Sequence, residues 1–303
     1  MASSCGLSGY VRAPETTNHY PLSFCRNHVS LAQFNALAIR NQNKTTMQTR
    51  PLASNLGLYV YAASAIFLGV LGLATAEFAL QWQNVGPTVP FRVPLAYLTA
   101  LIELAAGLAL LWPRIARLGA ITLTILYSVF TLLWVPSSFV DLGNYDPIGN
   151  VFEELSLVAG ALVLWAIFSP PDSWFARRQS FFTLLFGVCS ISFGVVHIKD
   201  MPGLLGAIPA WLPPSRMFWA YATTLGFFAA AISILTGILA PLASRLLTVE
   251  ILIFEFLFWI PNLRSAPGNH FNWAGNAISI AIGGAAWVVS DSISQAAKVR
   301  THT

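Results

Sequence analysis

Charged side chains are scarce in this chain. They make up 9% of its 303 residues, whereas hydrophobic residues make up 56% and the mean hydropathy is +0.65. Soluble domains carry roughly 25% charged residues, so the composition excludes a soluble globular protein and predicts one that spans a lipid bilayer. The net charge of +4 does not indicate a nucleic-acid partner, because the 16 Lys and Arg residues are scattered rather than gathered in one stripe.

Residues and motifs that would hold a metal or a cofactor are also lacking. The three cysteines, Cys5, Cys25 and Cys189, lie far apart in sequence, which excludes a CxxC redox pair. No His and Cys residues have the spacing of metal ligands, so the sequence predicts neither a zinc nor an iron–sulfur site. The stretch 69–72 lacks the Lys and hydroxyl residue of a phosphate loop. No cofactor is therefore evident from motifs.

Long apolar runs dominate what is present. About 20 apolar residues in a helix cross the hydrocarbon core of a bilayer, so each run predicts one span. The expected spans are residues 56–80, 94–112, 118–136, 151–168, 181–196, 217–239, 242–260 and 273–289. We therefore expect an all-α polytopic membrane protein with eight transmembrane helices. Small residues within the spans indicate close helix packing, at Ala63, Gly69, Ala105, Ala106 and Gly107.

A motif occurs twice in the chain. Residues 134–144 contain Trp-Val-Pro, six further residues and Gly-Asn, and residues 259–269 contain Trp-Ile-Pro, six further residues and Gly-Asn. A period this long predicts a duplicated module. We expect repeats of four spans at 51–170 and 171–292, followed by a short C-terminal tail at 293–303.

The repeated motif also predicts local structure. Pro136 and Pro261 are expected to end their helices, because proline cannot continue the hydrogen-bond ladder. The Gly-Asn pair that follows is expected to turn the chain with positive φ angles, which both residue types tolerate. Each tryptophan is expected at the headgroup level.

Residues 1–50 do not share the apolar pattern. They are rich in Ser, Asn, Thr and Gln, and Glu15 is their only acid. We expect a disordered polar tail. Two alternatives stay open: an organelle transit peptide, and an upstream extension that precedes a second start at Met47.

The basic residues predict the orientation of the spans. Cytoplasmic segments of membrane proteins carry an excess of Lys and Arg. With the N-terminus inside, the cytoplasmic segments hold Arg40, Lys44, Arg50, Arg114, Arg117, Arg177, Arg178, Arg245, Lys298 and Arg300, and the outer segments hold Arg92, Lys199, Arg216 and Arg264. We therefore expect both termini in the cytoplasm. An even number of spans in each half then makes the halves parallel repeats.

Several short motifs resemble the DoxX-like family of bacterial integral membrane proteins. They are residues 194–197 (GVVH), 208–214 (IPAWLPP), 219–221 (WAY) and 269–273 (NHFNW) in the second half, and residues 97–107 in the first. Thr75 stands where the second half has the family-like His197. The resemblance implies a bacterial inner (plasma) membrane location, and a component of a quinone-linked redox system or of an oxidative-stress system that works with other membrane redox proteins.

Acidic residues at membrane depth are the first candidate site. A charge there costs at least ~2.5–3.5 kcal/mol, so it usually faces the helix bundle and marks function. Glu103 lies in the second span, and Glu250 and Glu255 lie in the seventh, about 140° apart around the helix. Because their repeat partners are apolar, we expect one composite site with acids from two spans. The alternative is that each is a protonated or hydrogen-bonded structural residue.

The outer ends of the spans offer further candidates. His197 is the one side chain here that normally titrates near neutral pH, and Glu77 occupies the matching place in the first half. The competing interpretation is interfacial, with Lys199 reaching toward the headgroups. Asp146, His270 and Asn272 are the polar groups expected at a mouth formed by the outer hairpins. Glu153 and Glu154 are interpreted as structural acids at a helix N-terminus.

Two classes of function follow. The first is a redox-linked component that binds quinone between the two halves, with His197 and the buried acids handling protons. The second is a small-solute transporter or a non-catalytic membrane scaffold, which the missing cofactor motifs favour. The sequence does not show an independent catalytic activity.

Overall fold

The computed structural model describes residues 55–140 and 143–301. Residues 1–54, which include the predicted tail at 1–50, lie outside the described part. Eight long helices are present: α2 (Leu56–Thr75), α3 (Arg92–Leu110), α4 (Ala116–Trp134), α5 (Asp146–Ile167), α7 (Gln179–Lys199), α9 (Arg216–Thr236), α10 (Ala240–Phe254) and α12 (His270–Thr301). No strand occurs in these described ranges.

The prediction of eight apolar spans is confirmed, because eight helical stretches of the described chain are long and apolar enough to cross a membrane. The protein is therefore an all-helical integral membrane protein. Short elements join the long helices: η1 (Ser137–Phe139), α6 (Trp174–Arg177), α8 (Met201–Ala207), the π-helix η2 (Glu255–Trp259) and α11 (Ile260–Ser265).

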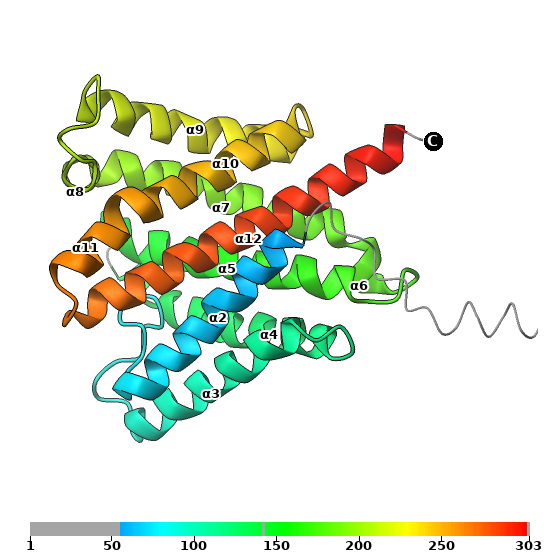
Figure 1. Ribbon diagram of the computed structural model, residues 1–303, viewed down its shortest axis with the longest axis horizontal. Coiled ribbons are helices and arrows are strands. Elements are labelled where there is room, and N and C mark those ends of the chain that lie inside the picture. The colour runs from blue at the N-terminus through cyan, green and yellow to red at the C-terminus, as the bar shows by residue number, and fades with distance from the viewer. Residues whose placement is uncertain (1–54, 141–142, 302–303) are drawn as a thin grey trace, which may run out of the picture. The chain divides into compact units, whose positions relative to one another are not determined.

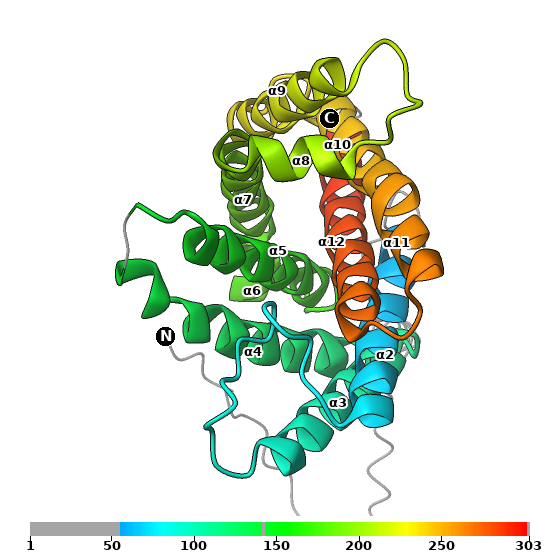
Figure 2. The ribbon, with the colours of Figure 1, turned by 90° about the vertical axis from the view of Figure 1, so that its left-hand side faces the viewer.

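The long helices form two groups of four. In the first helix group (α2, α3, α4, α5) and in the second (α7, α9, α10, α12), each helix packs on the next one in the chain. The groups meet where α2 packs on α12, α5 on α7 and α5 on α12. Figure 1 shows α5 and α12 side by side near the middle of the bundle, and Figure 2 shows the two groups from one end.

The connections lie at opposite ends of the bundle in alternation. The segments after α3, α5 and α9 lie at one end, and those after α2, α7 and α11 lie at the other (Figure 1). We call the second end the link face.

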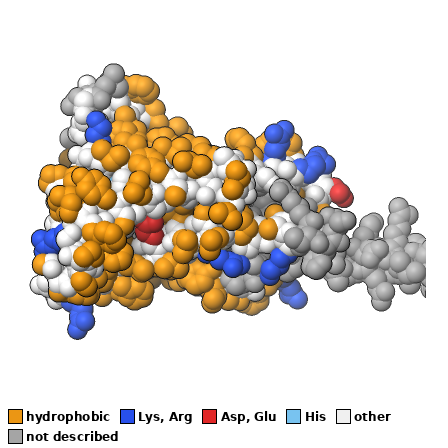
Figure 3. All heavy atoms as spheres, turned by 90° about the horizontal axis from the view of Figure 1, so that it is seen from above, with side chains coloured by type: hydrophobic (Ala, Val, Ile, Leu, Met, Phe, Trp, Pro, Cys, Tyr) orange, Lys and Arg blue, Asp and Glu red, His pale blue; other side chains and the backbone are white. Residues whose placement is uncertain are grey.

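The outside of the bundle is apolar, as expected for a protein in lipid. Leu118, Ile125, Leu225 and Ile232 are each 60–66% exposed. On the face drawn in Figure 3, hydrophobic side chains cover the middle, and Lys and Arg side chains lie toward the two ends. An acidic side chain is also visible on this face, among the hydrophobic side chains.

Glycines allow the two groups to approach closely. A Cβ added at Gly284 of α12 would lie 2.7 Å from the backbone nitrogen of Tyr61 on α2, and one at Gly57 would lie 2.7 Å from the nitrogen of Val288. Such backbone proximity is the packing that small residues provide in membrane helices. The prediction of close packing at Gly69 and Gly107 is confirmed within the first group.

The same prediction is wrong for Ala63 and Ala105, which are exposed on the outer surface of α2 and α3. They lie on the faces opposite to the packed ones.

The prediction that each proline of the repeated motif ends its helix is confirmed for Pro136, because α4 ends at Trp134, and is wrong for Pro261. Pro261 lies near the start of α11, which continues directly from η2. A π-helical turn just before a proline changes the hydrogen-bond ladder where the proline ring would otherwise clash with it, and this lets the helix continue. Pro136 keeps helical angles (φ −59°, ψ −42°) and leads into η1.

The predicted positive φ angles at the Gly-Asn turns are also wrong for Asn144, Gly268 and Asn269. The asparagine side chains make these turns instead. Asn144 Oδ1 accepts a hydrogen bond from the Asp146 N–H at 3.0 Å, and Asn269 Oδ1 accepts one from the Phe271 N–H at 3.0 Å. Such side-chain turns relieve the backbone of the need for a left-handed residue.

Three helix boundaries differ from the predicted spans, and the first two of them bear on the site. Helix α2 ends five residues early, because Ala76 adopts a left-handed conformation (φ 56°). Helix α5 starts at Asp146, with Pro147 in its first turn, and not at residue 151. Helix α12 continues through the predicted tail to Thr301.

The early end of α2 releases residues 76–91, which we call the link segment. Its residues 76–80 are predicted from the sequence to continue the first span. Instead Phe78, Trp82 and Gln83 are only 2–4% exposed, so this part of the segment is inserted among the helices. Figure 2 shows it running between α2, α4, α5 and α12 at the link face.

Candidate functional site

A large cavity of about 770 Å³ lies within the second helix group. Its wall is formed by α7, α9, α10, η2 and α12, by the last residue of α8 (Ala207) and by Ile208, Pro209 and Leu212, which follow α8. The first half contributes three residues to the wall, namely Gln81 and Trp82 of the link segment and Glu153 of α5. The cavity therefore belongs mainly to one half but is completed by the other.

The cavity wall is apolar and rich in aromatic rings. These include Trp82, Phe193, Trp219, Phe227, Phe254 and Trp259. Among the described residues that line it, none is Lys or Arg, and the ionisable ones are Glu153, His197 and Glu250. A wall of this kind suits an apolar molecule that carries a hydrogen-bonding group.

Glu250 presents a carboxyl group to this cavity from α10. The carboxyl packs against the backbone of α9 at Gly226, where a Cβ would lie 2.5 Å from Glu250 Oε2. Its other oxygen, Oε1, is buried and has no hydrogen-bond partner among the described residues. A buried polar atom without a partner is costly, so this oxygen is available to a ligand.

His197 lies near the end of α7 and also lines the cavity. Its ring packs edge-to-face on Phe227, with 5.0 Å between ring centres. Its Nδ1 lies 3.5 Å from the hydroxyl oxygen of Thr224 on α9. These contacts fix the plane of the imidazole.

Glu153 lines the cavity from α5, where it accepts a hydrogen bond from the indole N–H of Trp82 at 2.7 Å. Trp82 in turn packs on Trp259, with 5.8 Å between ring centres, and stacks on Phe271 at 5.5 Å. The two tryptophans of the repeated motif thus both hold the link segment, because Trp134 Nε1 donates to the Gln81 carbonyl at 2.7 Å.

The structure does not bring all predicted site residues together. Glu250 and His197 share the large cavity, but Glu255 and Glu103 do not line it. Glu255 is 3% exposed and lies beside Ser279 of α12. The predicted separation of Glu250 and Glu255 by about 140° around the helix agrees with Glu250 lining the cavity and Glu255 lying outside its wall. The expected composite site that joins Glu103 to Glu250 and Glu255 is wrong, because Glu103 points into the first helix group.

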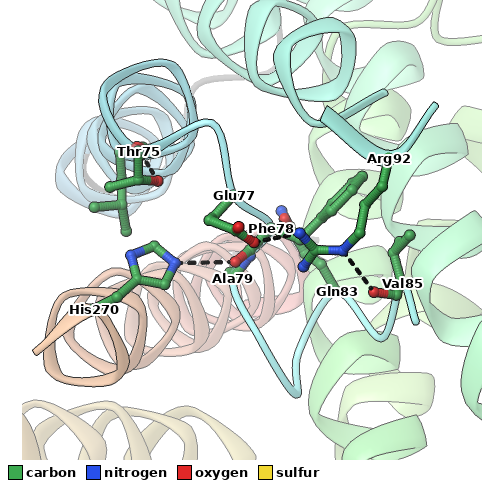
Figure 4. A network of polar contacts seen from close by, with 9 residues as sticks. Thr75, Glu77, Phe78, Ala79, Gln83, Val85, Arg92 and His270 are labelled. Atoms are coloured by element: carbon green, nitrogen blue, oxygen red, sulfur yellow. Dashed lines mark hydrogen bonds and ion pairs between the residues drawn. The ribbon is translucent and has the colours of Figure 1, made fainter. Parts of the chain in front are cut away.

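Glu103 belongs to a separate set of polar contacts around the link segment. Gln83 Oε1 accepts from the Ala79 N–H at 2.9 Å, which leaves its amide group to donate to Glu103 Oε1 at 2.9 Å. Glu77 forms an ion pair with Arg92 (Figure 4). A small cavity of about 10 Å³, room for about one water molecule, lies beside Glu77, Glu103 and His270.

The predicted mouth residues have mainly structural contacts. His270 Nε2 lies 3.0 Å from the Phe78 carbonyl oxygen and so attaches the link segment to α12 (Figure 4). Asn272 donates to the carbonyls of Asn262 and Ala266 and joins α11 to α12. Asp146 lies in the first turn of α5 and lines neither cavity.

The sequence-based interpretation of Glu153 and Glu154 as acids of a first helical turn is wrong. Because α5 starts at Asp146, they lie two turns inside the helix. Glu154 is 1% exposed, and neither of its carboxyl oxygens has a hydrogen-bond partner in the described part of the chain. The Asp-Pro pair at 146–147 is a helix-start signal that could have placed both acids at membrane depth.

Within the ranges that the structure describes, no three His, Cys, Asp or Glu side chains are grouped as metal ligands. Searches of protein-family models, of curated proteins and of solved structures find no match to this chain.

Proposed function

We propose that this protein binds a lipid-soluble small molecule, with quinones as the leading class, in the large cavity of the second helix group. The observation that carries the proposal is an apolar cavity of about 770 Å³ whose wall holds Glu153, His197 and Glu250. This volume lies within the roughly 300–1,000 Å³ typical of small-molecule sites.

The polar groups of the cavity suit a quinone headgroup. Quinone carbonyls accept hydrogen bonds, which a neutral carboxyl or an imidazole N–H can donate. The quinol form donates from its hydroxyls, and Glu250 Oε1 has no partner among the described residues that would compete. The aromatic wall provides stacking surface for the ring and apolar surface for a tail.

The lack of Lys and Arg among the described residues of the cavity wall also indicates which lipids the cavity can bind. An anionic headgroup would meet Glu153 and Glu250 without a compensating Lys or Arg among the described lining residues. Burying an unpaired charge in this way is unfavourable, so the cavity excludes phospholipid headgroups and fatty-acid carboxylates.

The proposed architecture has two parallel four-span repeats with both termini in the cytoplasm. Two observations support the repeats. Helix α2, the first of its repeat, packs on α12, the last of the other repeat, and α7 packs on α5 in the same way. Two equivalent repeats related by a twofold axis require such a pair of contacts. Asn144 and Asn269 also make the same turn contact. Arg114, Arg117, Arg177, Arg178, Arg245 and Lys298 all lie toward the end opposite the link face, which the positive-inside rule assigns to the cytoplasm.

The proposed setting is a bacterial inner membrane, where a DoxX-like protein would serve a quinone-linked redox or oxidative-stress system together with other membrane redox proteins. The short motifs at 194–197, 208–214 and 269–273 support the family. His197 lies in the first of these motifs and lines the cavity, which connects the resemblance to the site.

Glu250→Gln tests the proposal. In detergent, a short-tailed quinone should raise the melting temperature of the wild-type protein in a concentration-dependent way. The variant should bind the quinone about tenfold more weakly, because the substitution removes roughly one hydrogen bond between this side chain and the ligand. Such a loss weakens the binding free energy by ~1.4 kcal/mol. Thermal shift titrations of both proteins give the two dissociation constants.

Asp146→Asn is the control, because it removes an acid that lines neither cavity, and its quinone affinity should equal that of the wild type. If no quinone or quinol shifts the wild-type melting temperature, the proposal is wrong and a scaffold role remains. Equal affinity in the Glu250→Gln variant would remove Glu250 from the site.

A further inference from the structure

The first helix group contains a second cluster of buried polar side chains, separate from the large cavity. Glu103 of α3 is 2% exposed, Glu154 of α5 is 1% exposed and Tyr127 of α4 is 1% exposed. The two carboxyl groups and the tyrosine hydroxyl are near enough to interact electrostatically. The cluster lies at the centre of the group, away from lipid and solvent.

Most of these polar atoms have no partner. Both oxygens of Glu154 and the hydroxyl of Tyr127 lack a hydrogen bond to any described residue. Glu103 has one such bond, from Gln83 at 2.9 Å. Two carboxylates could not both be ionised at this depth without a compensating cation, so the geometry requires that the pair holds at least one proton.

A connected route leads from this cluster to the link face. The small cavity lies between Glu103 and two groups of that face, Glu77 and His270. Its volume of about 10 Å³ is enough for about one water molecule, which a carboxyl and an imidazole can hold by hydrogen bonds. His270 Nδ1 is buried and lacks a partner among the described residues, while Glu77 is half exposed.

The route is closed in the other direction. Toward the opposite end of the first helix group, the core is filled by Leu110, Leu123 and Leu164, each at most 1% exposed. None of these side chains can carry a proton. These three leucines therefore provide no proton route from the cluster to that end of the group.

We propose that Glu103 and Glu154 form a proton-binding site that exchanges with water at the link face through Glu77, His270 and the small cavity. On uptake, a hydronium ion at the link face gives its proton to a carboxylate oxygen of the pair, an O–H bond forms there, and a water molecule is left. On release, the same steps run in reverse. No electron transfer is involved, and the proposal stands whether or not a quinone binds in the large cavity.

The ionisable and charged groups that face this site come from every neighbouring element. They are Tyr61 of α2, Glu77 of the link segment, Arg92 of α3 (paired with Glu77), Tyr127 of α4, Glu153 of α5 and His270 of α12. Arg92 is the only cation among them, and its partner is Glu77. It therefore does not neutralise the buried pair.

Infrared spectroscopy of the purified protein tests this site. Protonated carboxyl groups give a C=O stretching band that is separate from that of carboxylates and that shifts when the proton is replaced by deuterium. We expect this band in two difference spectra: the wild-type spectrum minus that of Glu154→Gln, and the wild-type spectrum minus that of Glu103→Gln. The band should shift in D₂O while the protein stays folded. Gln keeps the size of Glu and is neutral, so both variants should fold.

The route is tested by the rate of that shift. His270→Gln keeps an amide donor for the Phe78 carbonyl but lacks the imidazole Nδ1, so it should slow deuterium exchange at the buried pair several-fold. Asp146→Asn, also at the link face but outside the route, should leave the rate unchanged. A missing band in both difference spectra, a band that never exchanges, or an unchanged rate in His270→Gln would each overturn the proposal.

Discussion

Ala222→Phe is expected to weaken quinone binding by about a hundredfold or more, equivalent to roughly 3 kcal/mol. Ala222 lies on α9 and lines the large cavity. A phenyl ring there would occupy space that the ligand requires, and the two cannot overlap. The cavity is already open in the free protein, so the added ring should not destabilise the fold. Thermal shift titration with a short-tailed quinone gives the change in affinity.

Ala229→Phe is the matched control. Ala229 lies on the same helix two turns later, is exposed, and does not line the cavity. The same added ring should leave quinone affinity unchanged there. Comparable loss in both variants would mean that the effect comes from α9 as a whole and not from the filled cavity, and full affinity in Ala222→Phe would place the ligand elsewhere.

Gly284→Ala is expected to lower the free energy of unfolding by about 1–3 kcal/mol, the usual cost of overpacking a well-packed core. The new Cβ would lie 2.7 Å from the nitrogen and 2.8 Å from the Cα of Tyr61. Both are backbone atoms of α2, so no flexible side chain can move aside. The helices must separate along the contact that joins the two groups. The melting temperature in detergent measures the effect.

Gly206→Ala provides the comparison. A Cβ at Gly206 in α8 would meet nothing within 4 Å, so the substitution should be neutral or stabilising there. If Gly284→Ala were as stable as Gly206→Ala, the close packing of α2 on α12 would not contribute to the stability of the protein.

The eight spans could be predicted from the sequence because long apolar runs require little beyond helix length and bilayer thickness. The relative directions of Glu250 and Glu255 also followed from helix geometry alone. Both predictions depend on local periodicity, which the sequence carries directly.

The link segment could not be predicted in the same way. Its burial depends on Ala76, which ends α2 in a left-handed conformation without any glycine to mark the position. Trp82 and Gln83 then find partners in Glu153 and Glu103, which are 71 and 20 residues away in sequence. No local pattern encodes such contacts.

The positions of the site residues could be predicted only in part, for the same reason. The apolar run starts the fourth span at residue 151, which makes Glu153 and Glu154 look like structural acids at a helix N-terminus, although the Asp-Pro pair at 146–147 marks the earlier start. Glu103 and Glu250 both follow the rule that acids at membrane depth face the bundle interior. Which helix group each one faces depends on tertiary packing alone.

Photolabelling tests the central claim most directly. A quinone analogue with a photoreactive group is irradiated with the purified protein, and the labelled peptides are identified by mass spectrometry. We expect labels on α9, α10 and η2 at cavity-lining positions such as Ala222, Glu250 and Phe258, and we expect unlabelled quinone to compete with them. Labels confined to lipid-facing positions such as Leu118 and Leu225, with no competition by unlabelled quinone, would contradict the proposed ligand site.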